Sequence, residues 1–201
     1  MYLYVPVLIR YYVGIISKMS LYKAWNFFKL FFGFHYSRIT GKPVQNALPF
    51  YVSIEPTTSC NLRCPQCPSG LRQFTRPTGM LQSNLFETLL PQLKKHLHSI
   101  TFYFQGEPYL NPDFLKMVSM AGKSGIYTIT STNAHYLDEN TARQTVLSGL
   151  DKLIISVDGI TQPVYEQYRV GGKLDKVMEG TRHIVEQKRK LKSPTPHIIW
   201  Q

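Results

Sequence analysis

Hydrophobic and polar positions alternate in blocks along most of this chain. From residue 49 onward, short runs rich in Ile, Val, Phe and Tyr lead into loops, and then into longer segments with apolar residues every three or four positions. The short runs are typical of strands and the longer segments are typical of amphipathic helices. The pattern predicts strands at 49–56, 99–104, 126–131, 152–157 and 197–201, and helices at 83–97, 113–125, 138–149 and 173–191.

Strands that alternate with helices of this length predict βαβ units, and therefore a parallel sheet with right-handed crossovers. The strands are apolar along their length, as expected where both faces of a sheet are covered. Four complete units and a fifth strand are too few for a closed barrel of eight strands. We therefore expect an α/β fold in the form of a partial (βα) barrel, preceded by N-terminal helices. Since the final apolar strand would be left with an unpaired edge, we interpret 49–201 as a core domain that is incomplete at its C-terminus.

The run at 1–20 is strongly apolar and raises the question of a membrane span or a leader. Pro6 and Arg10 interrupt it, and a charge near mid-span is expensive in hydrocarbon. The run also lacks the basic start and the small-residue cleavage site of a secretory signal. We therefore predict neither a transmembrane helix nor a secretory signal here.

A second apolar segment follows at 21–34. Leu21, Trp25, Phe28 and Phe32 recur in it at helical spacing, with lysines off that face. Such a helix can lie in a membrane interface, or it can pack against the main domain or a part of the protein outside this chain. The sequence leaves these alternatives open, and we treat 1–48 as a separate, helical N-terminal segment.

Composition and charge add limits on the class of protein. A hydrophobic content of 43% and an aromatic content of 13% exclude a disordered or fibrous chain. The net charge of +11 suits nucleic acid, anionic lipid or an acidic substrate. The basic run at 188–192 falls at the end of a predicted helix, where the helix dipole favours cations. No recognition motif for nucleic acid is present, and nucleic acid is not an expected partner.

All three cysteines, Cys60, Cys64 and Cys67, lie in the loop after the first predicted strand. An odd and crowded set leaves little room for a disulfide framework, so we expect reduced thiolates in the cytoplasm. The spacing C-x-x-x-C-x-x-C brings three thiolates within reach of one cuboidal iron–sulfur cluster, whose irons prefer soft sulfur ligands. Because a four-iron cluster has four corners, three thiolates leave one iron open for a substrate or cofactor.

The alternative for the cysteines is a zinc site. Zinc needs a fourth ligand, and the candidates are His96, His98 and His135. None of these histidines stands at a fitting local spacing from the cysteines. The spacing therefore favours the cluster.

A second motif, QGEP, follows the second predicted strand. Gly106 lets the backbone come close to a ligand, Glu107 can accept hydrogen bonds from an ammonium group, and Pro108 fixes the turn. Alone the motif is also typical of a plain strand-to-helix turn. Because loops at the carboxyl ends of parallel strands meet, we expect it to lie beside the cysteine loop.

Polar residues also follow the third and fourth predicted strands. They are Ser131 and Asn133 in STNAH, and Ser156 and Asp158 in SVDG. Their side chains could meet a ligand at the same edge of the sheet, although Asn, Asp and Ser favour turns for their own backbone bonds as well.

In the cysteine spacing and the order of these loops, the chain resembles the radical S-adenosylmethionine (radical SAM) superfamily from about residue 49 to its end. The resemblance implies a [4Fe-4S] cluster on the three cysteines, with SAM chelating the open iron through its amino and carboxylate groups. It implies reductive cleavage of SAM to methionine and a 5′-deoxyadenosyl radical, which abstracts hydrogen from a substrate. It places the amino group of SAM at QGEP, and its carboxylate and ribose near Ser131, Asn133, Ser156 and Asp158.

The chain departs from the family pattern at three positions. Gln105 replaces the first glycine of the family's G-G-E-P loop, and Ala134 replaces the glycine of T-N-G. Gln66 stands where many members carry an aromatic residue that meets the adenine. Contacts from the backbone of Gln66 could survive this change, whereas aromatic packing could not.

A last motif, YRVGG at 168–172, resembles the D-G…Y…R pattern of members with a C-terminal SPASM region that binds auxiliary clusters. Arg169 could reach a carboxylate of a ligand or close an ion pair within the loop. No cysteine follows Cys67, so we expect any auxiliary ligands beyond Gln201.

The resemblance therefore predicts a radical SAM enzyme, SPASM-like in its core, that acts on a peptide or another substrate. It implies SAM and an electron donor such as flavodoxin or ferredoxin as partners, while no general acid or base can be assigned. We expect a cytoplasmic protein, with contact to a membrane through 1–48 left open. The alternative is a membrane-associated binding or structural protein whose cysteines hold a structural metal.

Overall fold

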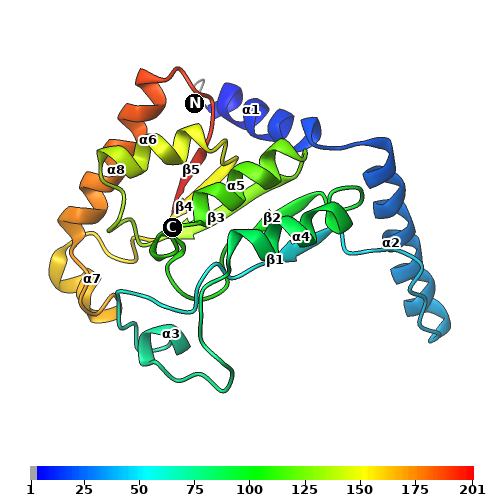
Figure 1. Ribbon diagram of the computed structural model, residues 1–201, viewed down its shortest axis with the longest axis horizontal. Coiled ribbons are helices and arrows are strands. Elements are labelled where there is room, and N and C mark those ends of the chain that lie inside the picture. Colours follow the sequence, from blue (N-terminus) through cyan, green and yellow to red (C-terminus); the bar gives the residue numbers. More distant parts are fainter. Residues whose placement is uncertain (1–3) are drawn as a thin grey trace.

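The computed structural model describes residues 4–201, and its centre is a five-stranded sheet in the order β1-β2-β3-β4-β5 (Figure 1). All neighbouring strands pair in parallel. Since the spatial order follows the chain order, each crossover returns on the same side of the sheet, as in an open barrel. This arrangement confirms the predicted α/β fold with a parallel sheet. The strands are β1 (Tyr51–Ser53), β2 (Ser99–Thr101), β3 (Tyr127–Thr132), β4 (Lys152–Ile155) and β5 (His197–Trp200).

The crossover helices bury their apolar faces against the sheet. Phe102, just after β2, lies between the rings of Phe86 and Phe114, with centroid distances of 5.6 and 6.1 Å. All three rings are buried, and edge or tilted contacts of this kind are favoured between aromatic rings. The helices are α4 (Ser83–Leu93), α5 (Phe114–Lys123), α6 (Glu139–Leu147) and α8 (Leu174–Lys190).

Three short helical segments lie where the sequence pattern predicts only loops. They are α3 (Pro68–Leu71), the 3-10 helix η1 (Pro108–Leu110) and α7 (Gln162–Tyr168). Each has a proline in its first turn, where the missing N–H costs nothing. Segments this short show no usable periodicity, although a proline in the first turn is typical of a helix N-terminus.

Two further helices, α1 (Tyr4–Ser17) and α2 (Leu21–Thr40), precede the sheet. Helix α1 crosses the amino-terminal ends of the strands. His98 Nε2, just before β2, donates to the carbonyl of Ile15 at 3.0 Å, and the Tyr11 ring lies 4.9 Å from the ring of His197 in β5. Helix α2 extends away from the same end of the sheet (Figure 1). Within residues 4–201, no helix is both long and apolar enough to cross a membrane.

Candidate cluster and cofactor site

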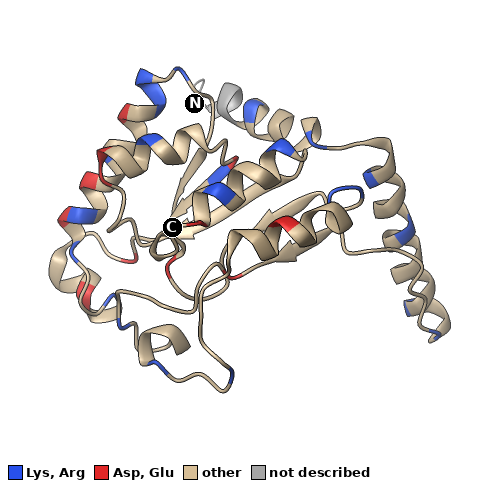
Figure 2. Cartoon of the chain, in the orientation of Figure 1, with Lys and Arg blue, Asp and Glu red and all other residues tan. Residues whose placement is uncertain are grey.

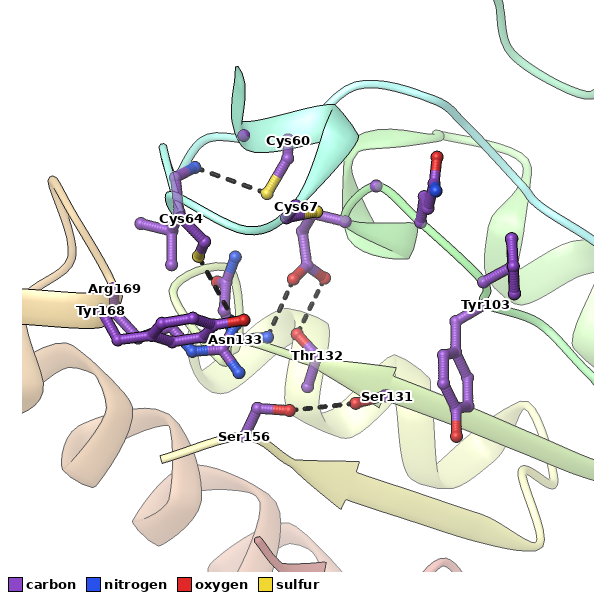
Figure 3. Close-up of a pocket in the computed structure, with 16 residues that line it drawn as sticks. Cys60, Cys64, Cys67, Tyr103, Ser131, Thr132, Asn133, Ser156, Tyr168 and Arg169 are labelled. Atoms are coloured by element: carbon purple, nitrogen blue, oxygen red, sulfur yellow. Dashed lines mark hydrogen bonds between the residues drawn. The ribbon is translucent and has the colours of Figure 1, made fainter. Parts of the chain in front are cut away.

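A cavity of about 170 Å³ opens at the carboxyl ends of the strands (Figure 3). Helix α1 lies at the opposite end of the sheet (Figure 1). The loops after β1, β2, β3 and β4 all contribute to the cavity wall. The cavity therefore brings together most of the site residues predicted from the sequence. These lining residues are Cys60, Cys64, Cys67, Gly106, Glu107, Ser131, Asn133 and Ser156.

The three cysteines are free thiols around this cavity. The loop that carries them is ordered by its own bonds: the Cys67 amide donates to the Cys64 carbonyl at 3.2 Å, and the Leu62 amide points at the Cys60 sulfur at 3.4 Å. Burial raises the pKa of the Cys60 thiol to about 11, and burial also raises the pKa of Cys64. Thiolates crowded in this way need a compensating cation, and a metal centre supplies one.

The donor set fits an iron–sulfur cluster. Soft sulfur ligands suit zinc or iron–sulfur centres, and the sulfurs of a cuboidal cluster's ligands attach to separate irons instead of converging on one point. In the part of the chain that the structure describes, no group of three or more His, Cys, Asp and Glu side chains is placed to hold a single metal ion.

Gly70 and Gly106 let the surrounding backbone pack against the cysteine loop. A Cβ at Gly70 would lie 2.5 Å from the amide nitrogen of Cys64. A Cβ at Gly106 would lie 2.1 Å from the carbonyl oxygen of Thr57, and the φ of +80° at Gly106 also favours glycine. The close approach expected at Gly106 is thus made to the cysteine loop of the protein itself.

Glu107 joins the loop after β2 to the end of β3. Its Oε1 accepts from the Thr132 hydroxyl at 2.8 Å and its Oε2 accepts from the Asn133 amide at 2.9 Å. Only 2% of Glu107 is exposed, and burial raises its pKa to about 7, while these hydrogen bonds act in the opposite direction. The carboxylate therefore fixes the relative position of two strand-end loops and still lines the cavity.

Ser131, near the end of β3, faces Ser156, just after β4. The hydroxyls of Ser131 and Ser156 are 3.2 Å apart, and both line the cavity. The Asn133 side chain donates to Asn61 Oδ1 at 2.8 Å, which connects it to the cysteine loop. Neutral donors and acceptors from two strand ends thus line the same cavity as the thiols.

Arg169 makes the ion pair within the loop that the sequence left as one of two alternatives. Its Nε donates to Asp158 Oδ2 at 2.6 Å, and a guanidinium nitrogen also contacts the same oxygen. Its Nη1 lies 3.9 Å from the sulfur of Cys64. This guanidinium places a permanent positive charge beside the thiols.

Three predicted residues do not line the cavity. Gln66 is exposed in the turn between Cys64 and Cys67, Pro108 is buried at the start of η1, and Asp158 lies behind Arg169. Thr132 and Tyr168 line it although the sequence did not assign them to the site, and so does Arg169, for which the sequence left a ligand contact as one of two alternatives. Their position at a strand end and in YRVGG was the only available signal.

Sequence and structure comparisons relate this chain to known proteins. A family profile described as "Radical SAM superfamily" matches residues 54–196. GTP 3′,8-cyclase of Limosilactobacillus fermentum is 33% identical over 136 residues, which cover 65% of this chain and 40% of that protein. PqqA peptide cyclase of Gluconobacter oxydans is 30% identical over 125 residues, which cover 62% of this chain and 34% of that protein. The chain thus spans two fifths or less of the length of these two relatives.

Solved structures share the fold. The crystal structure of Streptococcus suis SuiB bound to S-adenosylmethionine superposes with a TM-score of 0.59 at 20% identity, over 70% of this chain and 32% of SuiB. BtrN in complex with AdoMet and 2-DOIA gives a TM-score of 0.55 at 22% identity, over 78% of this chain and 57% of BtrN.

Proposed function

The chain belongs to the radical SAM superfamily, whose enzymes use a [4Fe-4S] cluster and SAM, and we propose on this basis that Cys60, Cys64 and Cys67 hold such a cluster. The observation that carries the proposal is the cavity of Figure 3. Three free thiols from the loop after β1 face one space together with polar groups from the three following strand ends. When bound, the cluster supplies one electron to SAM, whose sulfonium C–S bond breaks to give methionine and a 5′-deoxyadenosyl radical that abstracts hydrogen from a substrate.

Residues of this chain would bind and orient SAM. Glu107 offers carboxylate oxygens to the amino group of SAM, and the Ser131 and Ser156 hydroxyls can donate to its carboxylate or ribose. Asn133 closes this side of the cavity. The guanidinium of Arg169 adds positive charge near the place where a SAM carboxylate would lie.

The remaining predicted residues would act from outside the cavity wall. We assign Gln66 to a backbone contact with adenine and Pro108 to the geometry of the turn after Glu107. Asp158 would act through Arg169, which it holds in place.

The substrate we propose is a peptide or protein. Support comes from the motif around Tyr168 and Arg169, which is shared with SPASM-containing enzymes, and from two relatives. One is the PqqA peptide cyclase, and the other is SuiB, which has been crystallised with its precursor peptide SuiA. A SPASM-like enzyme would carry auxiliary cluster ligands outside residues 1–201.

We further propose that 49–201 is a radical SAM core and 1–48 a separate helical segment. The electron would come from a small carrier such as flavodoxin or ferredoxin. We place the protein in the cytoplasm, in contact with a membrane through 1–48. The alternative hypothesis is a membrane-associated binding or structural protein with a structural metal on the cysteines. Such a protein would not cleave SAM.

The experiment uses full-length protein reconstituted anaerobically with iron and sulfide. SAM and dithionite are added, and 5′-deoxyadenosine is measured by mass spectrometry. We expect its formation in the wild type and its loss in Cys64→Ser. Exposed Leu85 on α4 supplies the control variant Leu85→Ser, which should keep the activity. A protein that contains zinc, lacks sulfide and forms no 5′-deoxyadenosine would establish the alternative hypothesis.

A further inference from the structure

Helix α2 has its polar side turned inward and its aromatic side turned outward. Its buried positions are Lys23, Asn26 and Gly33. Trp25 and Phe32 are each 64% exposed, and further phenylalanines on the helix are exposed as well. A helix on the surface of a water-soluble protein normally shows the reverse pattern. The exposed side of α2 therefore matches an apolar environment and not water.

Internal contacts fix this orientation. The Lys23 ammonium donates to the Gly125 carbonyl at 2.6 Å, in the turn between α5 and β3. The Asn26 side chain exchanges two hydrogen bonds with the backbone of Leu48, at 2.8 and 3.0 Å. Rotating α2 to bury its aromatic side would break these bonds and expose the groups that make them, so the outward aromatic face is built into the fold.

Helix α1 repeats the pattern. Its inward side bears Tyr11, whose ring contacts His197 at the start of β5. Lys18, directly after α1, pairs with Asp151 just before β4. The opposite side presents large apolar residues to solvent, of which Ile16 is 66% exposed. We call the exposed sides of α1 and α2 together the α1–α2 face; its exposed apolar members include Ile9, Val13, Ile16, Trp25, Phe28 and Phe32.

Charge distinguishes among the partners that could cover the α1–α2 face. Residues 1–54 contain no Asp or Glu, and Figure 2 shows only basic residues along α1 and α2. Two copies of the chain would bring like charges together at this face, which disfavours self-association. An anionic bilayer offers both an apolar interior and negative headgroups. The basic residues of 1–54 are Arg10, Lys18, Lys23, Lys29, Arg38 and Lys42. Of these, Lys18 and Lys23 turn inward to Asp151 and Gly125, and the other four supply the charge at the face.

A basic pocket adjoins α1. Arg10 lines a cavity of about 520 Å³ together with Lys188, Arg189 and Lys192 from the end of α8 and the turn after it. The Lys188 ammonium is held by the carbonyl of Pro196 at 2.6 Å, while Arg189 and Lys192 are exposed. The basic run at the end of α8 is thus completed by a cation that lies far from it in sequence. Such a cluster suits a phosphate group.

We infer that the α1–α2 face docks on an anionic lipid bilayer, with the pocket of Arg10, Arg189 and Lys192 on a lipid phosphate. The inference rests on the membrane contact of the proposed function and identifies its lipid chemistry and orientation. Helix α1 covers the amino-terminal ends of the strands, whereas α3 and α7 lie at the other end (Figure 1). Docking therefore leaves the mouth of the cysteine cavity facing away from the bilayer, open to SAM and substrate.

The test is sedimentation of the full-length protein with vesicles of phosphatidylcholine, alone or mixed with phosphatidylserine. We expect strong binding to the mixed vesicles only. The double substitution Phe28→Ser with Phe32→Ser should weaken binding to the mixed vesicles at least tenfold, because each substitution removes one large apolar side chain that the bilayer would bury. Leu85→Ser with Leu147→Ser is the matched control, since it removes exposed apolar side chains from α4 and α6. This control should bind as the wild type does.

A second set of variants tests how much the basic pocket contributes to vesicle binding. Arg189→Glu and Lys192→Glu should each weaken binding by more than the roughly fivefold expected for loss of one cation near an anionic surface, because each also adds a negative charge. Arg143→Glu on the exposed side of α6 is the control and should have a smaller effect. Inorganic phosphate should displace the protein no better than chloride at equal ionic strength. Stronger displacement would assign the pocket to a free phosphate instead and overturn this part of the inference.

Two further outcomes would overturn the docking surface itself. One is equal binding to both kinds of vesicle. The other is absence of binding together with a dimer, seen by light scattering, that Phe28→Ser with Phe32→Ser dissociates. Vesicle binding is measured without SAM, and the surface variants should form 5′-deoxyadenosine in solution at the wild-type rate. Loss of SAM cleavage with intact vesicle binding would therefore count against the proposed function and not against the docking surface.

Discussion

The buried carboxylate of Glu107 accepts a 2.8 Å hydrogen bond from the hydroxyl of Thr132, and this contact joins the loop after β2 to the last residue of β3. The second carboxylate oxygen bonds to the next amide along the chain, that of Asn133. The two loops that flank the cysteine cavity are therefore held by one side chain. The position of the Glu107 carboxylate depends on the Thr132 hydroxyl, which the sequence pattern did not single out.

Removing that hydroxyl should destabilise the protein. Thr132→Val keeps the shape of the side chain but leaves a buried carboxylate oxygen with a weaker partner, so we expect the free energy of unfolding to fall by about 1–3 kcal/mol. Urea unfolding measures this change. In the control Thr88→Val, a hydroxyl that bonds to the Asn84 carbonyl at an exposed position of α4 is lost. An equal loss of stability in both variants would show that the contact between Thr132 and Glu107 contributes no more to the free energy of unfolding than an exposed hydrogen bond does.

Substitution of Gly106 should move the cysteine loop. Gly106→Ala combines a positive φ with a Cβ that would lie 2.1 Å from the Thr57 carbonyl oxygen. We expect a loss of stability of at least about 2 kcal/mol and reduced iron content after reconstitution. Gly79→Ala is the control, because a Cβ there would meet no atom within 4 Å. Normal stability and iron content in Gly106→Ala would contradict the packing described for this loop.

The ion pair of Arg169 and Asp158 should be measurable by a double-mutant cycle. The side chains are 19% and 35% exposed, and the arginine makes two contacts with one carboxylate oxygen. For Arg169→Met and Asp158→Asn we expect a coupling energy of about 1 kcal/mol or more in urea unfolding. The exposed pair of Lys190 and Glu139 is the comparison and should show a smaller coupling. Equal coupling energies would mean that the Arg169–Asp158 pair stabilises the protein no more than the exposed Lys190–Glu139 pair does.

Stability should depend on pH through His98, which anchors α1 to the sheet. Burial lowers the pKa of His98 below its ordinary 6.5; the charge of Lys23 acts in the same direction, and that of Asp151 opposes it. Well above pH 6.5 the ring is neutral in folded and unfolded chains alike. As the pH falls below this value, the unfolded chain binds a proton that the folded chain does not yet bind, so the free energy of unfolding decreases.

Urea unfolding at about pH 7.5 and about pH 5.5 checks this expectation. We expect His98→Gln to reduce the difference between the two pH values, by no more than about 1.4 kcal/mol per pH unit. His35→Gln, at an exposed position on α2, should leave it unchanged. The same pH dependence in the wild type and in His98→Gln would exclude His98 as a source.

The alternation of strands and helices was predictable because the four crossover helices are long enough to show their period and the strands between them are apolar. The three cysteines and the strand-end loops were predictable for a related reason, since parallel strands bring their carboxyl ends to one edge. The side on which a loop residue lies is decided by tertiary contacts. Gln66 and Asp158 therefore lie outside the cavity wall, whereas Thr132 and Arg169 form part of it.

Periodicity also could not decide which face of α2 turns inward. The stripe of Leu21, Trp25, Phe28 and Phe32 was correctly placed on one helix, but all four side chains are exposed. The inward orientation is set by polar contacts of Lys23 and Asn26 with backbone groups of Gly125 and Leu48. These are long-range bonds, and a local pattern of apolar residues carries no information about them.

We propose that the three cysteines hold a four-iron cluster and leave one iron for SAM. Full-length protein reconstituted anaerobically should contain about four irons and four sulfides for this site. After reduction, its electron paramagnetic resonance spectrum should change when SAM is added, since SAM would bind the open iron. Zinc in place of iron and sulfide, or a cluster spectrum that SAM leaves unchanged, would contradict the account.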